Sequence, residues 1–431
     1  MEKKNGRVYI VQAKQSKGTV HVAGWVHEVR DLGKLKFLLL RDRTGLLQIT
    51  IKKGKAPEQL LALNFHREEV LAITGKIAHN KIAPDGVELI PEKIEVLATV
   101  EKKLPVDPSD MVPAEVEVRL DHRYLDLRRK KIQSIFSIKS TLANAFRQVL
   151  LSKQFVEIHP TCITGAATEG GTDVFPLQYF ENQAFLVQSP QLYKQLCVIG
   201  GLDQVFMTVP VFRAEKHNTT SHLNEIIQMD VEMGFANHFD VMEILGDTVL
   251  HMLKKTKEER GEELKILDAE INLPKKIPQY TYSELVDQLK EKGFPMEWGE
   301  DFSKEAEKKL AEIVGEELFF IYDWPTAVRA FYSMPDSKNE EICHAFDLVY
   351  RGLEIASGAQ RIHQVDILEK QLKKRGLDPY SFEFYLNAFR LGAPPHAGWS
   401  IGLERLTMKV CNLPNIREAM LFPRDRTRLH P

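Results

Sequence analysis

Residues 211–232 limit what this chain can fold into more than any other stretch, because strand-like segments there carry an unusual number of charges. The apolar, β-branched run Val205 to Val211 predicts a buried strand, and it leads directly into Arg213 and Glu215. A polar loop with two histidines follows. The chain then returns as a second strand-like segment, in which two carboxylates two positions apart point to the same face.

The two carboxylates of the returning segment are Asp230 and Glu232. Burying charges without partners costs on the order of several kcal/mol each, so this set is unusual for a purely structural hairpin. A solvated hairpin with a charged loop is the simpler alternative. We favour a nucleotide site, in which Arg213 contacts a phosphate, Glu215 and the loop surround a ligand, and Asp230 contacts an ammonium group.

The length and composition are those of an ordinary soluble globular protein. With 431 residues the chain is long enough for two or three domains, and 43% hydrophobic and 27% charged residues are typical values. The N-terminus has no apolar segment and no run of about 18 apolar residues occurs, so we expect a cytoplasmic protein without a membrane span. The four cysteines are scattered, which predicts reduced thiols and no metal site among them.

The N-terminal region is basic, although the formal net charge of the chain is −2 at pH 7. Residues 1–60 contain 13 Lys and Arg against 5 Asp and Glu. A basic region on a nearly neutral chain suits a polyanionic partner. Solvated surface lysines would give the same count, so the charge alone does not decide.

Residues 18–100 have an all-β pattern of five short strands with Gly-rich turns and one helical interlude. This pattern matches a five-stranded oligonucleotide-binding barrel, the OB-fold. Arg30, Phe37 and Gln48 are candidates for contacts with unpaired bases, although a core position is an equally good interpretation of Phe37. The stretch 104–118 is rich in proline and acidic residues, which predicts a linker.

The rest of the chain mixes helices and strands. Apolar residues at helical spacing between 131 and 154 predict an amphipathic helix, and the strand after it is interrupted by Pro160, which marks an edge or an interface. The loop 168–171 (TEGG) suits a lid over a substrate, although a surface turn would look the same. Residues 237–330 carry no motif that we can interpret. Further charged residues in strand-like or helix-starting positions are Asp347, Glu354, Arg361 and Arg405.

Three segments follow the barrel pattern in a fixed order: the helix and strand that end at Pro160, the stretch FRAEKHNTTSHLNEIIQMDVEM, and GWSIGLERL. Together they resemble the three signature motifs of the class II aminoacyl-tRNA synthetases, subclass IIb. Within that group the chain looks similar to the aspartyl-tRNA synthetases of the short archaeal type, which also occur in some bacteria. The resemblance covers nearly the whole chain, down to FPRD near the C-terminus.

The resemblance implies an α+β architecture in three parts. Residues 1–103 would form an OB-fold anticodon-binding domain, and residues 104–130 a linker or hinge. Residues 131–431 would form a class II catalytic domain, with an antiparallel sheet flanked by helices. The family also implies a homodimer, with Pro160 at its interface.

The resemblance further implies that ATP is a substrate and that Arg213 and Arg405 are catalytic. Arg213 would contact the α-phosphate and then the adenylate, where charge develops. Arg405 would stack on adenine or hold the γ-phosphate end, and its planar guanidinium suits either task. Glu215 would contact the adenine amine or the tRNA terminus, and His222 would lie near the triphosphate.

By the same resemblance, Asp347 and Glu354 would hold Mg²⁺, which usually takes one or two carboxylates plus phosphate oxygens. Glu354 would therefore also belong to the ATP site. The loop 168–171 matches the flipping loop of the family. The chain departs from some relatives at Ile226, where they stack an aromatic residue on adenine, so adenine packing would rest on Arg405 and an aliphatic face.

The residues expected around the amino-acid substrate are Glu169, Ser189, Gln191, Lys194, Asp230 and Arg361. The cations Lys194 and Arg361, directed at one pocket, suit the side-chain carboxylate of L-aspartate. Against a neutral amide they would be left under-paired, at a cost of roughly a few kcal/mol. The asparaginyl-tRNA synthetases, the nearest alternative, generally lack the lysine. We therefore expect ATP-dependent ligation of aspartate to tRNA(Asp) through an aspartyl-adenylate.

Two other functions are possible on the same fold. A non-catalytic paralogue would bind tRNA or regulate, but such proteins usually lose a motif arginine or a metal carboxylate that this chain keeps. An ATP-dependent asparagine synthetase is disfavoured because those relatives lack the anticodon barrel.

His27 and Pro84 are expected near the third anticodon base, which is C in tRNA(Asp) and U in tRNA(Asn). Proline offers no donor there, and one imidazole can either donate or accept. Relatives with this pairing look like the enzymes of relaxed specificity, which also aspartylate tRNA(Asn) for later amidation. The expected anticodon-binding residues are thus His27, Arg30, Phe37, Gln48 and Pro84.

Overall fold

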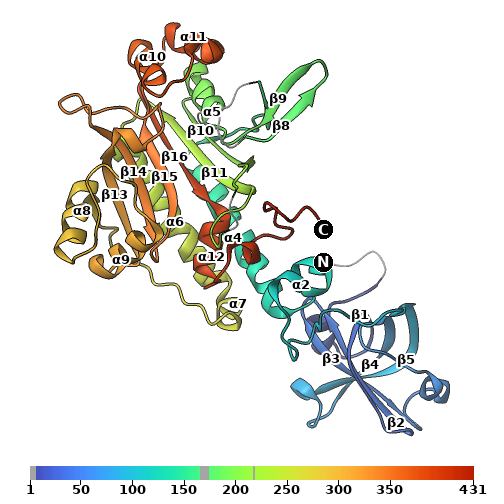
Figure 1. Ribbon diagram of the computed structural model, residues 1–431. Helices are drawn as coiled ribbons and strands as arrows, with labels where there is room; N and C mark the ends of the chain where they lie inside the picture. Colours follow the sequence, from blue (N-terminus) through green and yellow to red (C-terminus); the bar gives the residue numbers. More distant parts are fainter. Residues whose placement is uncertain (1–5, 166–173, 217–218) are drawn as a thin grey trace. The chain divides into compact units, whose positions relative to one another are not determined.

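A computed structural model of the chain describes residues 6–165, 174–216 and 219–431. The chain divides into two compact units, Met1–Lys130 and Lys131–Pro431, coloured from blue to red along the sequence in Figure 1. Among the described residues, no helix is both long and apolar enough to cross a membrane.

The N-terminal unit is built around a closed five-stranded barrel with the strand order β1-β2-β3-β5-β4, which confirms the predicted OB-fold. Leu38 and Leu40 point into the barrel and are fully buried, because alternate residues of a strand share a face. Phe37 has the opposite orientation and is partly exposed, so it lies outside the barrel core. The elements are α1 (Ile10–Lys14), β1 (Thr19–Asp31), β2 (Leu35–Asp42), β3 (Gly45–Lys52), β4 (Val70–His79) and β5 (Val87–Ala98).

Residues 104–130, for which the family resemblance implies a linker or hinge, contain the helices α2 (Val116–Asp121) and α3 (Arg123–Asp126). Arg123 donates to Asp126 at 2.5 Å, and both side chains are fully buried. Arg128 forms a 2.9 Å ion pair with Glu68, the buried carboxylate that also binds Arg41 of the barrel. The ion pair between Arg128 and Glu68 attaches the second half of the stretch to the barrel.

The C-terminal unit contains an eight-stranded sheet with the order β12-β13-β14-β15-β16-β11-β10-β6. From β13 to β10 in this order, each strand pairs antiparallel with the next. The edge strands pair in parallel, β12 with β13 and β6 with β10. The sheet strands are β6 (Val156–Glu157), β10 (Gln204–Phe212), β11 (Glu225–Gly234), β12 (Gln279–Thr281), β13 (Leu318–Pro325), β14 (Ile342–Tyr350), β15 (Glu354–Gln360) and β16 (His396–Gly402). A separate three-stranded sheet consists of β7 (Ile163–Thr164), β8 (Pro176–Tyr179) and β9 (Asn182–Leu186).

Helices cover the sheet, as expected for the α+β class. The predicted amphipathic helix is α4 (Lys130–Ser152), and its Phe146 packs edge-on against Phe206 of β10 and Trp399 of β16. Helix α6 (His238–Glu259) packs against β14, β15 and β16 (Figure 1). The other helices are α5 (Gln191–Cys197), α7 (Gly261–Ile266), α8 (Tyr282–Glu291), α9 (Lys304–Val314), α10 (Val365–Lys374), α11 (Glu383–Arg390) and α12 (Leu403–Val410).

Candidate active site

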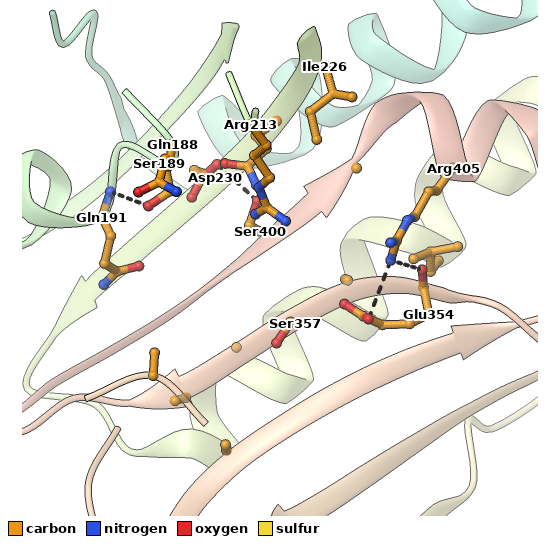
Figure 2. A pocket seen from close by; sticks show the side chains of 18 of the residues that line it. Gln188, Ser189, Gln191, Arg213, Ile226, Asp230, Glu354, Ser357, Ser400 and Arg405 are labelled. Atoms are coloured by element: carbon orange, nitrogen blue, oxygen red, sulfur yellow. Dashed lines mark hydrogen bonds and ion pairs between the residues drawn. The ribbon is translucent and has the colours of Figure 1, made fainter. Parts of the chain in front are cut away.

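The C-terminal unit holds a cavity of about 460 Å³ on one face of its sheet. The strand register places Asp230 of β11, Ser400 of β16 and Ser357 of β15 side by side, and all three line the cavity (Figure 2). Trp399, the neighbour of Ser400, points to the opposite face and packs under α4. Alternate residues of the same strands therefore build the cavity and the core.

Most residues expected from the sequence come together here. Asp347 lies beside this lining, as the register partner of Ser357, and Glu169 with the loop 168–171 falls outside the described residues. The expected residues that line the cavity are Ser189, Gln191, Lys194, Arg213, Glu215, His222, Asp230, Glu354, Arg361 and Arg405.

One end of the cavity contains a buried cluster of two cations and two carboxylates. Lys194 Nζ lies 2.7 Å from Asp230 Oδ1 and 3.5 Å from Glu232 Oε2. Arg361 donates to both oxygens of Glu232, at 2.9 and 3.2 Å. Ser400 Oγ donates to Asp230 Oδ2 at 3.0 Å. The two cations were predicted, but Glu232, which pairs with both, was not assigned a role.

Glu232 is charged despite complete burial. Burial alone would raise the pKa of this carboxyl, but Arg361 and Lys194 bring the pKa below its usual value. The carboxylate lies over Gly398, where a Cβ would come within 2.1 Å of Glu232 Oε2. Glycine at 398 is therefore required for the cluster.

The loop between β10 and β11 is held by Asn224. The backbone N–H of Arg213 donates to the Asn224 carbonyl at 2.9 Å. In return, Asn224 Nδ2 donates to the carbonyls of Arg213 and Glu215 at 2.8 and 3.3 Å. These bonds fix the backbone, while the side chain of Arg213 lines the cavity (Figure 2).

Arg405, in the first turn of α12, forms the other end of the cavity. Its Nη1 donates to the backbone carbonyl and to Oε2 of Glu354, at 3.1 and 3.3 Å, and its Nη2 lies 3.3 Å from His222 Nε2. Burial and the Arg405 guanidinium lower the pKa of His222 to about 4. His222 is therefore neutral near pH 7, and its Nε2 can accept from Arg405.

Several carboxylates gather beside this end. Burial raises the pKa of Asp347 to about 6, although Arg329 binds both of its oxygens. Burial and the nearby Glu354 raise the pKa of Glu307, on α9, to about 7. Glu307 Oε1 also accepts the backbone N–H of Glu354 at 3.3 Å. Oxygen ligands with mutual repulsion of this kind suit a hard divalent cation.

Sequence reasoning missed several of these residues. Glu307 and Arg329 lie in the stretch 237–330, where no motif pointed to them. Ser357 and Ser400 differ in this respect. Ser357 follows Glu354 by three residues on β15, and Ser400 lies on β16 within the segment GWSIGLERL, five residues before Arg405.

On the barrel, the register brings the expected base-binding residues to the outer face. Arg30 of β1 pairs with Phe37 of β2, and Leu39 of β2 pairs with Gln48 of β3. Arg30 is highly exposed and forms an ion pair with Glu28 at 2.9 Å. A cation, an aromatic ring and an amide thus share one face.

His27 and Pro84 belong to different features of the barrel. His27 occupies a bulge in β1, and its Nδ1 lies 2.8 Å from Arg41 Nη1. Burial and Arg41 lower the pKa of His27, so the imidazole is neutral at pH 7. Pro84 is exposed in the turn that connects β4 to β5.

Comparisons with known proteins agree with this arrangement. Residues 115–426 match the family of tRNA synthetases class II (D, K and N), and residues 20–97 match the OB-fold nucleic acid binding domain. Among solved structures, an asparaginyl-tRNA synthetase from Pyrococcus horikoshii complexed with asparaginyl-adenylate superimposes with a TM-score of 0.93 at 34% identity, covering 98% of this chain and 99% of that one. An aspartyl tRNA synthetase from Entamoeba histolytica gives 0.89 at 31% identity, with 99% and 94% covered.

Sequence relatives are more similar still. The aspartate–tRNA(Asp/Asn) ligase of Methanocaldococcus jannaschii is 48% identical over 415 residues, 96% of this chain and 94% of the relative. The aspartate–tRNA(Asp) ligase of Pyrococcus abyssi is 48% identical over 420 residues, 96% of each chain. This chain therefore belongs to the class II aminoacyl-tRNA synthetases, in the family of the aspartate–tRNA ligases.

Proposed function

We propose that this enzyme ligates L-aspartate to the 3′ end of tRNA(Asp) in two steps. The α-carboxylate of aspartate attacks the α-phosphorus of ATP, which forms aspartyl-adenylate and releases pyrophosphate. The 3′-terminal ribose hydroxyl of the tRNA then attacks the adenylate carbonyl and releases AMP. Because the carboxylate is already a nucleophile, the protein has to supply position and charge stabilisation rather than a general base.

The nucleotide would occupy the part of the cavity between Arg213 and Arg405. Arg213 would stabilise the α-phosphate as negative charge builds on it. Arg405 is already oriented by Glu354 and by neutral His222, so its planar side chain is ready to bind adenine or the terminal phosphate. Ile226, which lines the same cavity, supplies an aliphatic surface.

The observation that carries the choice of aspartate is the buried ion-pair cluster. If the substrate ammonium binds Asp230, Lys194 loses its 2.7 Å partner and is left with the more distant Glu232. The side-chain carboxylate of aspartate restores the pairing of Lys194, whereas the amide of asparagine does not. A buried charge without its partner costs about 3–5 kcal/mol, which is enough to favour aspartate over asparagine.

The carboxylates beside the cavity fit Mg²⁺. Glu354 lines the cavity, and Asp347 lies next to Ser357 with a pKa raised by burial. A bound Mg²⁺ would neutralise charge on the ATP phosphates. Glu354 would hold it directly, with Asp347 and Glu307 as further oxygen donors.

A homodimer is also part of the proposal. In the single chain, β6 forms an edge of the large sheet, and Pro160, which cannot donate to a strand ladder, lies three residues after its end. Light scattering on the purified chain would distinguish a dimer from a monomer.

Charging of a tRNA(Asp) transcript with labelled aspartate tests the proposal as a whole. We expect ATP-dependent formation of aspartyl-tRNA. A chain that binds the tRNA but forms neither adenylate nor aspartyl-tRNA would instead be a non-catalytic paralogue.

Replacing Phe37 with alanine should weaken tRNA charging by about 1–3 kcal/mol, the usual effect of one lost base stack. Aspartate-dependent ATP–pyrophosphate exchange without tRNA should not change, because Phe37 lies outside the barrel core. Leu97→Ala, at an exposed apolar residue of β5, is the matched control and should change neither activity. A parallel fall of exchange and charging in Phe37→Ala would mean that the ring is structural.

We further propose that the enzyme aspartylates tRNA(Asn) as well as tRNA(Asp). Neutral His27 is held by Arg41, and Pro84 has no donor, so neither residue gives a group that rejects uracil. The kcat/KM values for the two transcripts should therefore differ by less than about 100-fold, or near 3 kcal/mol. A larger preference for tRNA(Asp) would show that the barrel discriminates.

A further inference from the structure

Three potential metal ligands meet on the face of the large sheet opposite the active-site cavity. His344 lies on β14 next to Ala345, which lines the cavity, so the His344 side chain points the other way. Asp323 lies on β13, and His238 is the first residue of α6, the helix that packs on β14 and β15. None of the three belongs to the catalytic machinery described above.

The backbone conformation at Asp323 directs its side chain towards His344. The ladder between β13 and β14 has a bulge between Tyr322 and Trp324, and Asp323 has a φ of +56°. A bulge re-aims the side chain of its extra residue, and a positive φ is tolerated by aspartate better than by most residues. The carboxylate is thereby brought to His344, with Oδ1 3.5 Å from Nδ1.

The ligand atoms of this cluster lie close together, and two of them have no hydrogen bond. One atom from each of His238, Asp323 and His344 lies within 4.8 Å of the other two. Apart from their mutual contact at 3.5 Å, Asp323 Oδ1 and His344 Nδ1 are shielded from solvent and form no hydrogen bond within the part of the chain that the structure describes. Buried polar atoms without partners are rare, and a missing ion is one of the explanations.

The spacing suits a transition metal. Zinc bonds of about 2.0–2.2 Å in a tetrahedron place ligand atoms about 3.4 Å apart, and the contact between Asp323 and His344 already has this length. The His238 and His344 rings are stacked, 4.5 Å apart and nearly parallel. A metal lies in the plane of each imidazole it binds, so one ring would tilt out of the stack on binding.

A polar side chain lies close to one ring nitrogen of each histidine. Asp336 Oδ2 lies 3.6 Å from His344 Nε2, and its Oδ1 accepts the backbone N–H groups of Lys338 and Asn339. Gln360 Oε1 lies 3.5 Å from His238 Nδ1. Such partners on one ring nitrogen leave the other nitrogen, here His344 Nδ1 and His238 Nε2, for a metal.

We propose that His238, Asp323 and His344 bind one Zn²⁺ ion, with a water molecule in the remaining position. Two imidazoles and one carboxylate favour a transition ion over Mg²⁺, which prefers oxygen ligands and keeps several waters. The ion would connect the start of α6 to β13 and β14. Its role is structural, because it lies on the opposite face of the sheet from the catalytic residues.

Calorimetric titration of the chelator-treated full chain with Zn²⁺ tests this site. Millimolar Mg²⁺ is kept in the buffer to occupy the active-site carboxylates. We expect one Zn²⁺ per chain. Gln360→Ala removes a residue that contacts a ligand and should lower the Zn²⁺ affinity by about 10–100-fold. His238→Ala and His344→Ala each remove a ligand and should lower the affinity by more than that. His251→Ala, on the same helix α6, is the matched control and should bind like the parent.

Asp323→Asn keeps the shape of the side chain and removes its charge, so it tests the site even if a histidine variant folds poorly. Saturating Zn²⁺ should raise the Tm of the parent and of His251→Ala, because a ligand that binds only the folded state stabilises it. It should not raise the Tm of Asp323→Asn. Absence of Zn²⁺ binding by the parent, or equal affinity in the parent and the cluster variants, would overturn the proposal.

Discussion

Replacing Arg213 with alanine should lower aspartate-dependent ATP–pyrophosphate exchange by about 100-fold or more, since one preorganised donor to a developing oxyanion is worth that much. The effect should be on kcat more than on KM for ATP, because the charge on the α-phosphate grows in the transition state. The loop backbone should stay in place, since Asn224 holds it through main-chain carbonyls of the loop.

Two further variants make this prediction specific. Arg213→Lys keeps the positive charge but loses the planar, bidentate guanidinium. We expect its exchange activity to lie between those of the parent and Arg213→Ala. Arg390→Ala removes an exposed arginine that pairs with Glu369 and Glu383 away from the cavity, and it should leave exchange unchanged. If Arg213→Ala keeps exchange activity within about tenfold of the parent, Arg213 does not stabilise the α-phosphate.

Replacing Lys194 with methionine should reduce kcat/KM for aspartate by about 100-fold or more. The change removes the cation next to Asp230 and Glu232 and leaves buried carboxylates under-paired, which typically costs about 3–5 kcal/mol. The KM for ATP should change only a few-fold, because Arg213 and Arg405 remain. Arg361→Leu should have the same selective effect, since it deprives Glu232 of its bidentate partner.

Thermal denaturation separates this selective effect from a loss of folding. An equal loss of affinity for aspartate and ATP, together with a large fall in Tm, would mean that Lys194 supports the architecture rather than the substrate.

Local patterns in the sequence were enough to predict much of this molecule. The strands β10 and β11 with Arg213 and Asp230, the amphipathic helix α4, and the five-stranded barrel all rest on periodicity within short segments. The charged residues in these segments also indicate a site for a phosphate and an ammonium group.

Pairing between distant segments was not predictable in the same way. Glu232 and Arg361 are 129 positions apart, and only the strand order, which inserts β16 between β15 and β11, brings them together. For Asp347 the sequence suggested a metal ligand but not Arg329, the cation that neutralises it. The same limit applies to His238, Asp323 and His344, which come from three elements with no shared motif.

Amino-acid-dependent ATP–pyrophosphate exchange by the purified chain, without tRNA, tests the central claim most directly. Aspartate and asparagine would be compared over a range of concentrations at fixed ATP and Mg²⁺. The ion-pair cluster predicts exchange with aspartate at a kcat/KM at least about 100-fold above that for asparagine. Exchange with asparagine equal to or above that with aspartate, or exchange with neither, would contradict the account.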